Sequence, residues 1–510
     1  MLKYQQTLPR TGPEREALRE KGQFWTPEWV AEAMVSYVLY ERPDHIFDPA
    51  VGSGVFFRAA MTVAKEMALD RLHLIGTEID PNAIRKALEK DLTEHDVSNV
   101  MIRDFVINPP HATYRAIVAN PPYIRHHRLT NEIKVECKRM CNNSIGKAID
   151  GRAGLHIFFL IRALQLLEKG GRLAFIMPAD TCEGVFALDL WNWITQKYRL
   201  DAVITFSPAA TPFPGVDTNA IIFLIKNTER KDFFYWVKCT EPNTSKFKEW
   251  VRSDFQSNHA AELIVHKRKL NEGLSTGLSR PPLDNERCEH ILLDFASVMR
   301  GIATGANDFF FLTKKQVEKL QIPDDLLVPA VSRTRDVPGN EITNELLDIL
   351  DAKGRPTLLF SPDNRLLDAF PLQVRDYLIR GYEIGLPNKP LISMRNPWYQ
   401  MEKRIPPPIL FAYLGRRNAR FIRNYSGVVP LTGFLCVYPH YIEKEYINNL
   451  FKMLSDAEVV NNLSLVGKSY GGGALKVEPR SLEKLPIPNY IAERYNLAKP
   501  CKVQTELFKL

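Results

Sequence analysis

The chain has few cysteines and no long apolar segment. Its seven cysteines are scattered, odd in number and free of any Cys-x-x-Cys pair, which suits reduced thiols. No apolar run approaches the roughly 18 residues that a membrane-spanning helix needs. The start, Met1–Gln5, also lacks the apolar region of a secretion signal. These absences predict a cytoplasmic protein that has neither disulfides nor a membrane anchor.

Residues 117–124 read Ile-Val-Ala-Asn-Pro-Pro-Tyr-Ile and predict a short apolar strand that ends in a rigid turn. The amide oxygen of Asn120 and the carbonyl of Pro121 both accept hydrogen bonds, and the fixed φ of two prolines, Pro121 and Pro122, keeps them aimed at one point. A planar amine held there gains electron density on nitrogen. Tyr123 offers a flat face on which the attached ring stacks. The motif predicts a site that methylates an amino group on a flat substrate.

A second copy of the motif is present, Asn108-Pro109-Pro110-His111. It lacks the aromatic residue and follows no clear buried strand. Ligands of open α/β sheets bind at the carboxyl ends of strands, so we take Asn120 as the catalytic copy.

Residues 45–56 predict a strand, a turn with Gly52 and Gly54, and a helix that starts near Phe56. Glycines at such a turn let the backbone approach a ligand closely. The spacing departs from the dinucleotide fingerprint Gly-x-Gly-x-x-Gly, because residue 57 is Phe. Asp48, just before the turn, places a carboxylate where a cationic group of a ligand fits.

Two further strand ends carry acids. Residues 72–78 predict a strand that ends in Glu78, an acid that can accept from both hydroxyls of a ribose. Residues 101–105 predict a third strand end, where Asp104 can accept from an adenine amino group and Phe105 can cover the ring.

These motifs and their order resemble the gamma-class, TaqI-like type II DNA adenine-N6 methyltransferases, which use S-adenosylmethionine. That family has a Thr-Pro motif first, then the glycine motif, then Asn-Pro-Pro-Tyr, then a target-recognition domain. Here Gly22–Pro27, Asp48–Gly54 and Asn120–Tyr123 follow in that order. The match is good over residues 21–228 and looser beyond about residue 285.

The resemblance implies a Rossmann-like fold and a role for each motif. Thr26 would contact the methionine carboxylate, Glu78 the ribose, and Asp104 and Phe105 the adenine of the cofactor. The other cofactor-binding residues would be Asp48, Pro49, Ala50, Gly52 and Gly54. The segment 211–219 resembles the family's second base-stacking element, which makes Phe213 the expected partner of Tyr123 across a flipped-out adenine. The reaction needs no metal, so we predict none, although His126, His127, Cys137 and Cys141 lie near one another in sequence.

Alternating strands and helices predict a doubly wound, mostly parallel α/β sheet. Its parts include a helix over 155–168 that ends at Gly170-Gly171, and strands over 172–177 and 220–226. The polar stretch 227–231 is expected to close the sheet region, and 270–285 reads as a linker. We therefore predict a catalytic domain over 1–283 and a mixed α+β target-recognition domain over 284–510. Within the latter, 469–475 reads as a flexible loop.

The basic excess lies in the C-terminal half. Residues 231–510 hold 39 Lys and Arg against 32 Asp and Glu, which is +7 of the chain's net charge of +8. Basic residues attract phosphates and Arg can read guanine edges, so we expect the densest basic region to bind double-stranded DNA. Its members are Arg395, Lys403, Arg404, Arg416, Arg417, Arg420 and Arg423.

Several alternatives stay open. An Asn-Pro-Pro-Tyr site also serves methyltransferases of RNA or of protein glutamine, a DNA cytosine-N4 enzyme more typically has Ser at position 120, and the fold could be a silent DNA-binding protein. By resemblance we expect a monomer on DNA and a separate restriction endonuclease as its genetic companion. The recognition sequence cannot be read from the chain.

Overall fold

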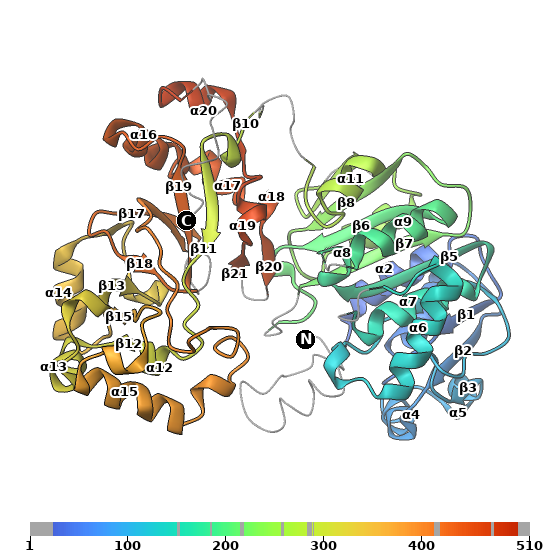
Figure 1. Cartoon of the computed structure of the whole chain (residues 1–510). Coiled ribbons are helices and arrows are strands. Elements are labelled where there is room, and N and C mark those ends of the chain that lie inside the picture. Colours follow the sequence, from blue (N-terminus) through green and yellow to red (C-terminus); the bar gives the residue numbers. More distant parts are fainter. Residues whose placement is uncertain are drawn as a thin grey trace. The chain divides into compact units, whose positions relative to one another are not determined.

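The computed structural model describes residues 24–149, 153–183, 186–214, 219–256, 260–282, 288, 290–412, 419–470 and 474–497. The chain divides into two compact units, Met1–Pro282 and Leu283–Leu510 (Figure 1). We call them unit 1 and unit 2. In the part of the chain that the structure describes, no helix is both long and apolar enough to cross a membrane.

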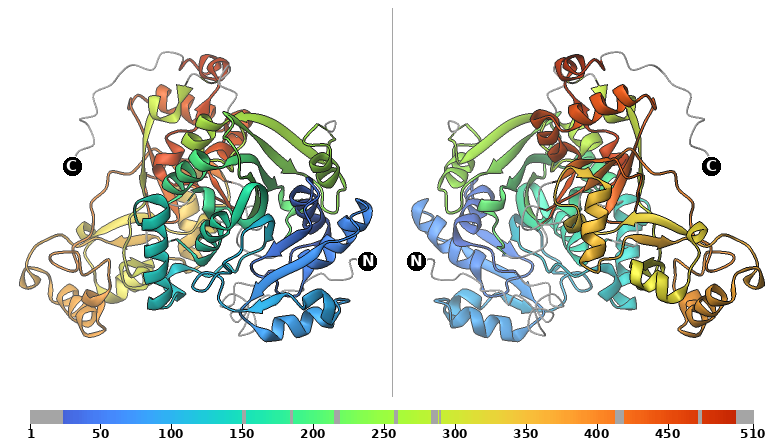
Figure 2. Two further views of the ribbon diagram at one scale, coloured as in Figure 1. Left: turned by 90° about the vertical axis from the view of Figure 1, so that its right-hand side faces the viewer. Right: turned by 90° about the vertical axis from the view of Figure 1, so that its left-hand side faces the viewer.

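The described part of unit 1 forms a nine-stranded sheet (Figure 2). In spatial order its strands are β3 (Val100–Ile102), β2 (His73–Glu78), β1 (His45–Asp48), β4 (Tyr114–Ala119), β5 (Leu167–Pro178), β7 (Ala220–Lys226), β6 (Arg199–Phe206), β8 (Phe233–Cys239) and β9 (Leu263–Lys269). The first five are mutually parallel, whereas β7 runs antiparallel to both its neighbours and β9 antiparallel to β8. The predicted mostly parallel α/β sheet is confirmed.

Helices cover both faces of this sheet, so its central strands are buried on both sides. Along β4, Ile117 and Ala119 belong to one core cluster, and Ala116 and Val118 to the other. The first cluster includes residues of α6 (Asn131–Ile145), α7 (Leu155–Gln165), α9 (Ala187–Lys197) and α11 (Leu270–Thr276). The second includes residues of α2 (Glu28–Val38), α3 (Val55–Glu66) and α10 (Lys246–Arg252). The short helices are α4 (Pro81–Leu88), α5 (Glu94–Val97) and α8 (Asp180–Glu183).

The helix predicted over 155–168 ends earlier than expected. It stops at Gln165, and residues 167–170 already belong to β5. Gly170 has φ +80° and its N–H donates to the carbonyl of Asn227, while a Cβ on Gly171 would lie 2.9 Å from the Arg115 carbonyl oxygen. The glycine pair therefore serves an irregular stretch of the strand and not a helix end.

Two predicted boundaries are also wrong. The polar stretch 227–231 does not close the sheet, because β8 and β9 extend it further. The predicted linker 270–285 begins with α11, whose Leu270 and Gly273 are buried. Leu278, which follows that helix, belongs to the core of unit 1.

Unit 2 is a mixed α+β structure, as predicted. Its five-stranded sheet has the order β11 (Ala296–Arg300), β19 (Phe434–Pro439), β16 (Ile409–Ala412), β17 (Arg420–Asn424) and β14 (Glu341–Ile342). Its four-stranded sheet has the order β12 (Phe311–Leu312), β15 (Leu358–Phe360), β13 (Leu327–Val331) and β18 (Val429–Pro430). Two short pairs join β10 (His290–Ile291) to β22 (Pro486–Ile487), and β20 (Lys468–Tyr470) to β21 (Ala474–Lys476).

The helices of unit 2 pack on these sheets around three apolar clusters. They are α12 (Asn307–Phe310), α13 (Lys314–Leu320), α14 (Asn344–Ala352), α15 (Leu372–Glu383), α16 (Lys444–Leu454), α17 (Ala457–Asn461), α18 (Leu463–Val466), α19 (Pro479–Leu482) and α20 (Asn489–Arg494). The segment predicted as a flexible loop, 469–475, differs from expectation: its ends belong to the antiparallel pair β20–β21, and residues 471–473 lie outside the described residues.

Candidate active site

The predicted site residues of unit 1 meet at one edge of the sheet. β1 ends at Asp48, β2 ends at Glu78, and Asn120 directly follows β4. These strands are parallel neighbours, so their carboxyl ends lie at the same edge. The strand order reverses between β1 and β4, and such switch points are where open α/β sheets bind ligands.

Asp48 is a fully buried carboxylate with one oxygen unused. Its Oδ1 accepts the N–H of Ala50 at 2.9 Å, and Oδ2 has no hydrogen-bond partner among the described residues. Burial raises the pKa of Asp48 to about 8; the Ala50 N–H opposes this shift and the nearby Glu78 carboxylate adds to it. A buried acid with an unsatisfied oxygen is suited to hold a cationic group.

The turn that contains Gly52 and Gly54 follows Asp48 and is hydrogen-bonded to Glu78. Gly52 and Gly54 both have positive φ, +55° and +76°, which other L-residues rarely adopt. The Gly52 N–H donates to Oε2 of Glu78 at 2.8 Å, and Oε1 of Glu78 accepts two further backbone N–H groups. A carboxylate accepts about four hydrogen bonds, so Glu78 keeps capacity for a ligand hydroxyl. The Pro49 carbonyl accepts from the hydroxyl of Thr77 and is a structural contact.

The loop after β3 places Asp104 and Phe105 differently from each other. Oδ1 of Asp104 accepts the N–H groups of Val106 and Ile107, so the carboxylate shapes its own turn. Phe105 is buried against Phe47 and Phe159, with ring centroids 5.9 and 5.2 Å apart. Asp104 is therefore the half-exposed residue of this pair.

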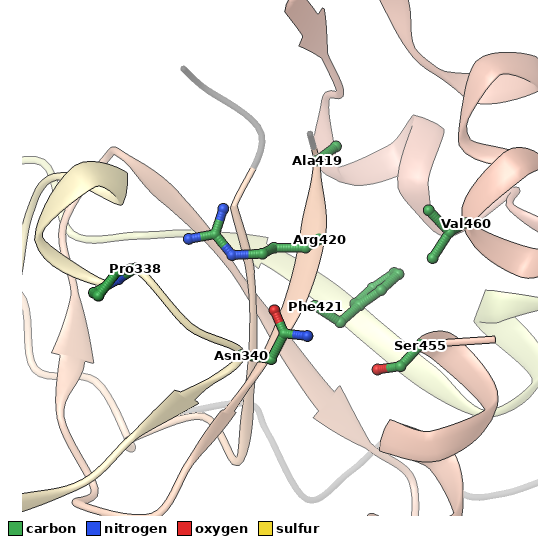
Figure 3. A pocket seen from close by; sticks show the side chains of 7 residues that line it. All are labelled: Pro338, Asn340, Ala419, Arg420, Phe421, Ser455 and Val460. Carbon is green, nitrogen blue, oxygen red and sulfur yellow. The ribbon is translucent and has the colours of Figure 1, made fainter. Parts of the chain in front are cut away.

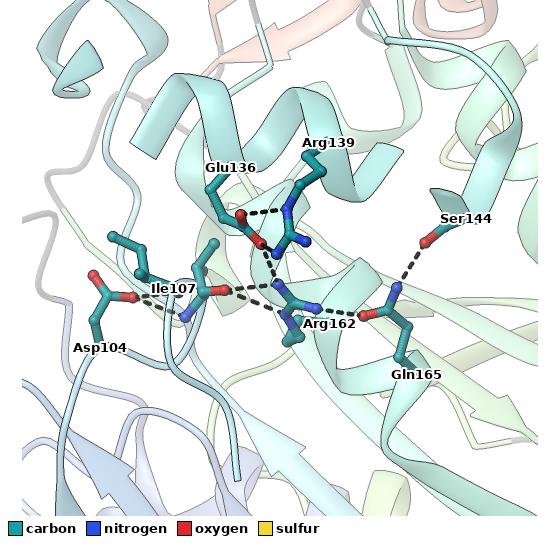
Figure 4. A network of polar contacts seen from close by, with 8 residues as sticks. Asp104, Ile107, Glu136, Arg139, Ser144, Arg162 and Gln165 are labelled. Atoms are coloured by element: carbon teal, nitrogen blue, oxygen red, sulfur yellow. Dashed lines mark hydrogen bonds and ion pairs between the residues drawn. The ribbon is translucent and has the colours of Figure 1, made fainter. Parts of the chain in front are cut away.

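Arg162 of α7 holds this loop from the other side (Figure 4). Its Nη2 donates to the Val106 carbonyl at 2.9 Å and to Oε1 of Glu136 at 3.0 Å. Arg139 holds the same Glu136 carboxylate, and hydrogen bonds from Arg139 and Arg162 keep the pKa of Glu136 below its ordinary value. The loop is thus fixed through both an N–H and a carbonyl.

A hydrogen-bonded clamp orients the side chain of Asn120. Its Nδ2 donates to the Phe24 carbonyl at 2.6 Å and to the Thr26 hydroxyl at 3.1 Å. With the amide turned over, its oxygen would face the Phe24 carbonyl oxygen, which is repulsive. Both bonds use the nitrogen, so Oδ1 faces away from the clamp as an acceptor. Thr26 is buried, whereas Asn120 itself is half-buried.

Three aromatic rings pack against one another here, and two of them belong to the clamp residue Phe24 and the motif residue Tyr123. The Phe24 ring lies 5.4 Å from Tyr123 and 5.8 Å from Phe213. Tyr123 and Phe213 are 6.3 Å apart but nearly perpendicular, at 78°. The Tyr123 hydroxyl donates to the Ile176 carbonyl at 3.1 Å, and burial raises its pKa well above the ordinary value. The structure brings both predicted stacking residues together, with their faces not parallel.

Two residues escaped the sequence argument. Phe24 precedes the Thr-Pro motif and supplies both a ring and a carbonyl to the site. Ile79 follows Glu78 and is 65% exposed at the same sheet edge. An exposed apolar side chain beside an acid at a strand end is suited to cover a flat ring. The position directly after the acidic strand end is the signal that would have identified it.

The second motif copy, Asn108–His111, lies in the turn that follows β3, where the Asn108 N–H donates to the Asp104 carbonyl. Among the described residues, no comparable pair of hydrogen bonds holds the side chain of Asn108. Asn120 is the copy that directly follows a buried strand, as predicted.

The basic residues predicted to bind DNA in unit 2 mostly bond to the protein itself. Nη2 of Arg395 donates to the carbonyls of Ala303 and Thr304. Arg404 donates to the Arg300 carbonyl and to Glu402. Lys403 is exposed, and Arg416 and Arg417 lie outside the described residues.

Arg423 and Arg420 also bond to backbone carbonyls. Arg423 is 7% exposed and donates to the Pro408 carbonyl at 2.7 Å. Arg420 donates to the carbonyls of Val337 and Gly339. It lines a cavity of about 350 Å³ (Figure 3) together with Pro338, Asn340, Ala419, Phe421, Ser455 and Val460.

Comparison with known proteins covers both units. Residues 4–268 match the sequence model of a family described as N-6 DNA Methylase. Residues 283–508 match the model described as Type II methyltransferase M.Eco57I, C-terminal domain. Type II methyltransferase M.AccI of Acinetobacter calcoaceticus is 24% identical over 478 residues, 92% of this chain and 85% of that protein. Type II methyltransferase M.XamI of Xanthomonas campestris pv. amaranthicola is 26% identical over 490 residues, with the same coverage.

A solved structure shares the fold. The Type IIL restriction-modification enzyme MmeI, determined in complex with DNA, superposes with a TM-score of 0.54 and 13% identity. The superposition covers 92% of this chain, which spans 64% of the length of that structure.

Proposed function

This chain belongs to the N-6 DNA methylase family, and from that premise we propose that it transfers a methyl group from S-adenosylmethionine to N6 of adenine in double-stranded DNA. The clamped amide of Asn120 is the observation that carries the proposal, because it presents one fixed acceptor at the switch point of the sheet. The similarity to type II methyltransferases supports a role as the modification component of such a system.

The residues at the sheet edge fit the cofactor. Oδ2 of Asp48, buried without a partner among the described residues, suits the cationic amino group of the methionine part. Glu78 would accept from the ribose, Asp104 from the adenine amino group, and Ile79 would cover the adenine ring. Gly52 and Gly54 would let the backbone pass close to the ligand, next to Ala50. Bound there, the cofactor supplies an electrophilic methyl group on a sulfonium.

The clamp explains how this chain activates the amine. Oδ1 of Asn120 and the carbonyl of Pro121 accept the two N–H groups of N6, which directs the nitrogen lone pair toward the methyl group. Pro121 and Pro122 have fixed φ, so the two acceptors do not drift apart. Such positioning provides most of the rate enhancement. The methylated nitrogen then loses one proton, and no covalent bond to the protein forms.

The adenine must leave the helix to reach this site, at a cost of a few kcal/mol. Stacking on an aromatic side chain returns roughly 1–3 kcal/mol per ring. The rings of Tyr123 and Phe213 lie at 78° to each other, so stacking on both faces of the base requires one of the two rings to turn. Phe24, which contacts both rings, would then line the pocket.

Unit 2 is proposed to recognise the DNA sequence, and its match to the C-terminal domain of a type II methyltransferase supports this. Of the basic residues predicted to touch DNA, Lys403, Arg416 and Arg417 remain candidates. We further propose that the protein acts as a monomer on DNA and that a separate restriction endonuclease cuts the same site.

The test is to incubate the protein with unmethylated DNA and S-adenosylmethionine, digest the DNA and identify the methylated nucleoside by mass spectrometry. We expect N6-methyladenine from the wild type and none from Asn120→Ala, which should still bind the cofactor. N4-methylcytosine would overturn the base assignment. An active Asn120→Ala variant would overturn the assignment of the site.

A further inference from the structure

A short basic segment follows the catalytic motif. This segment comprises Arg125, His126, His127 and Arg128, and residues 126–128 form a 3-10 helix. Consecutive Cα atoms are about 3.8 Å apart, so the Cα of Arg125 lies within roughly 7.6 Å of the Cα of Tyr123. The segment therefore begins close to Tyr123, one of the aromatic residues of the site.

Both ends of the basic segment are fixed to the core. Before it, the carbonyl of Ile124 accepts the N–H of Leu155, the first residue of α7, at 2.9 Å. After it, Leu129 is buried, and the hydroxyl of Thr130 caps α6. The four side chains are thus held in a defined place and do not belong to a long mobile loop.

The side chains of the basic segment point outward. Arg125, His127 and Arg128 are exposed, and the two histidine rings meet edge to face at 5.4 Å. Within the part of the chain that the structure describes, no acid forms an ion pair with Arg125. This contrasts with Arg395, Arg404, Arg420 and Arg423 in unit 2, whose guanidinium groups bond to backbone carbonyls.

We propose that the basic segment binds the DNA phosphates that flank the flipped-out nucleotide. This inference rests on the proposed function. A nucleotide that rotates out of the helix keeps its backbone bonds, so the adjacent phosphates must lie at the mouth of the base pocket. DNA carries one charge per 3.4 Å of each strand, so two cations three residues apart can engage successive phosphates. The segment thereby holds the strand while the base is out.

The test is the salt dependence of DNA binding by the double variant Arg125→Ala/Arg128→Ala. The logarithm of the DNA-binding constant falls linearly with the logarithm of salt concentration. Each lost phosphate contact makes this slope less steep by about 0.9, so two lost contacts make it less steep by about 1.8. We expect that reduction, together with weaker binding at low salt. Cofactor affinity should stay at the wild-type value, because both side chains are exposed, and denaturant unfolding checks that the variant is folded.

Two further variants make the result specific. Lys65→Ala/Arg71→Ala removes the same charge at the opposite edge of the sheet, at the end of α3 and just before β2, and should leave the slope unchanged. Arg125→Lys/Arg128→Lys keeps the charge and should keep most of the slope. An unchanged slope in the alanine variant, with normal binding by the wild type, would overturn this inference alone. Absence of salt-dependent DNA binding by the wild type would instead overturn the proposed function.

Discussion

At the scale of single residues, Asp48 links protonation to cofactor binding. Burial raises its pKa to about 8, so at pH 6.5 the carboxyl carries a proton in the cofactor-free protein. An ammonium group at Oδ2 favours the ionised form, so binding releases about one proton. We expect cofactor affinity to rise with pH up to about 8, by nearly tenfold per unit. It should then fall as the ligand's own amino group, with a pKa of roughly 8, loses its proton.

Isothermal titration calorimetry in buffers of different ionisation enthalpy measures the released proton at pH 6.5. Asp48→Asn is the matched variant, since it keeps the shape and cannot release a proton. It should bind at least about tenfold more weakly, with no proton release. A wild type that releases no proton at pH 6.5 would show that Asp48 is already ionised and would refute the prediction.

The residues of the site were predictable in type but not in arrangement. The motif around Asn120 gave the acceptor, because residue type and order carry that information. The clamp by Phe24 and Thr26 depends on a contact across 94 to 96 residues of sequence, which no local pattern encodes. The perpendicular rings of Tyr123 and Phe213 likewise depend on packing, and the roles of Phe105 and Phe213 stay predictions.

At the scale of elements, α7 determines the shape of the loop after β3 through Arg162. Its guanidinium reaches the Val106 carbonyl through two nitrogens, at 2.9 and 3.3 Å, and holds Glu136 as well. Lysine has a single donor group and cannot make this set of bonds. We expect Arg162→Lys to weaken cofactor binding several-fold and to leave kcat at saturating cofactor close to the wild-type value. Steady-state kinetics against cofactor concentration separates the two effects.

Arg139→Ala is the control for this element. Arg139 also bonds to Glu136, but its side chain is largely exposed and, among the described residues, forms no hydrogen bond with the loop. It should leave the KM for the cofactor unchanged. If both variants raise the KM equally, the charge of Glu136, and not the hold on Val106, controls the loop.

Elements with strong periodicity were predicted well, and element ends were not. The strands at 45–48, 73–78 and 220–226 follow from apolar runs before turn residues. The glycines at 170 and 171 also occur after helices, so local sequence could not reveal that β5 contains them. Residues 270–276 are polar on one side only, and α11 forms because Leu270 and Gly273 pack against the sheet.

At the scale of the whole molecule, composition gives the number of charged residues but not the groups to which they bond. The C-terminal half holds nearly all of the net charge of +8, which favoured a DNA-binding surface there. The structure shows that several of those guanidinium groups donate to backbone carbonyls in loops that precede strands. A cation that is buried and bonded contributes to the stability of unit 2, whereas an exposed cation contributes to the attraction of DNA.

Arg423 and Lys403 test that distinction within one unit. Arg423→Ala removes the hydrogen bond from a buried, charged donor to the Pro408 carbonyl, which keeps only the N–H of Asn424. A hydrogen bond of this kind contributes about 1.5–3 kcal/mol to the free energy of unfolding. We expect denaturant unfolding to show that loss, with the salt slope of DNA binding unchanged at temperatures where the variant is folded. Lys403→Ala, at an exposed position, should leave the unfolding midpoint unchanged. It should make the salt dependence of DNA binding less steep by about 0.9. A lower slope in Arg423→Ala, without loss of stability, would mean that Arg423 leaves its buried position when DNA binds.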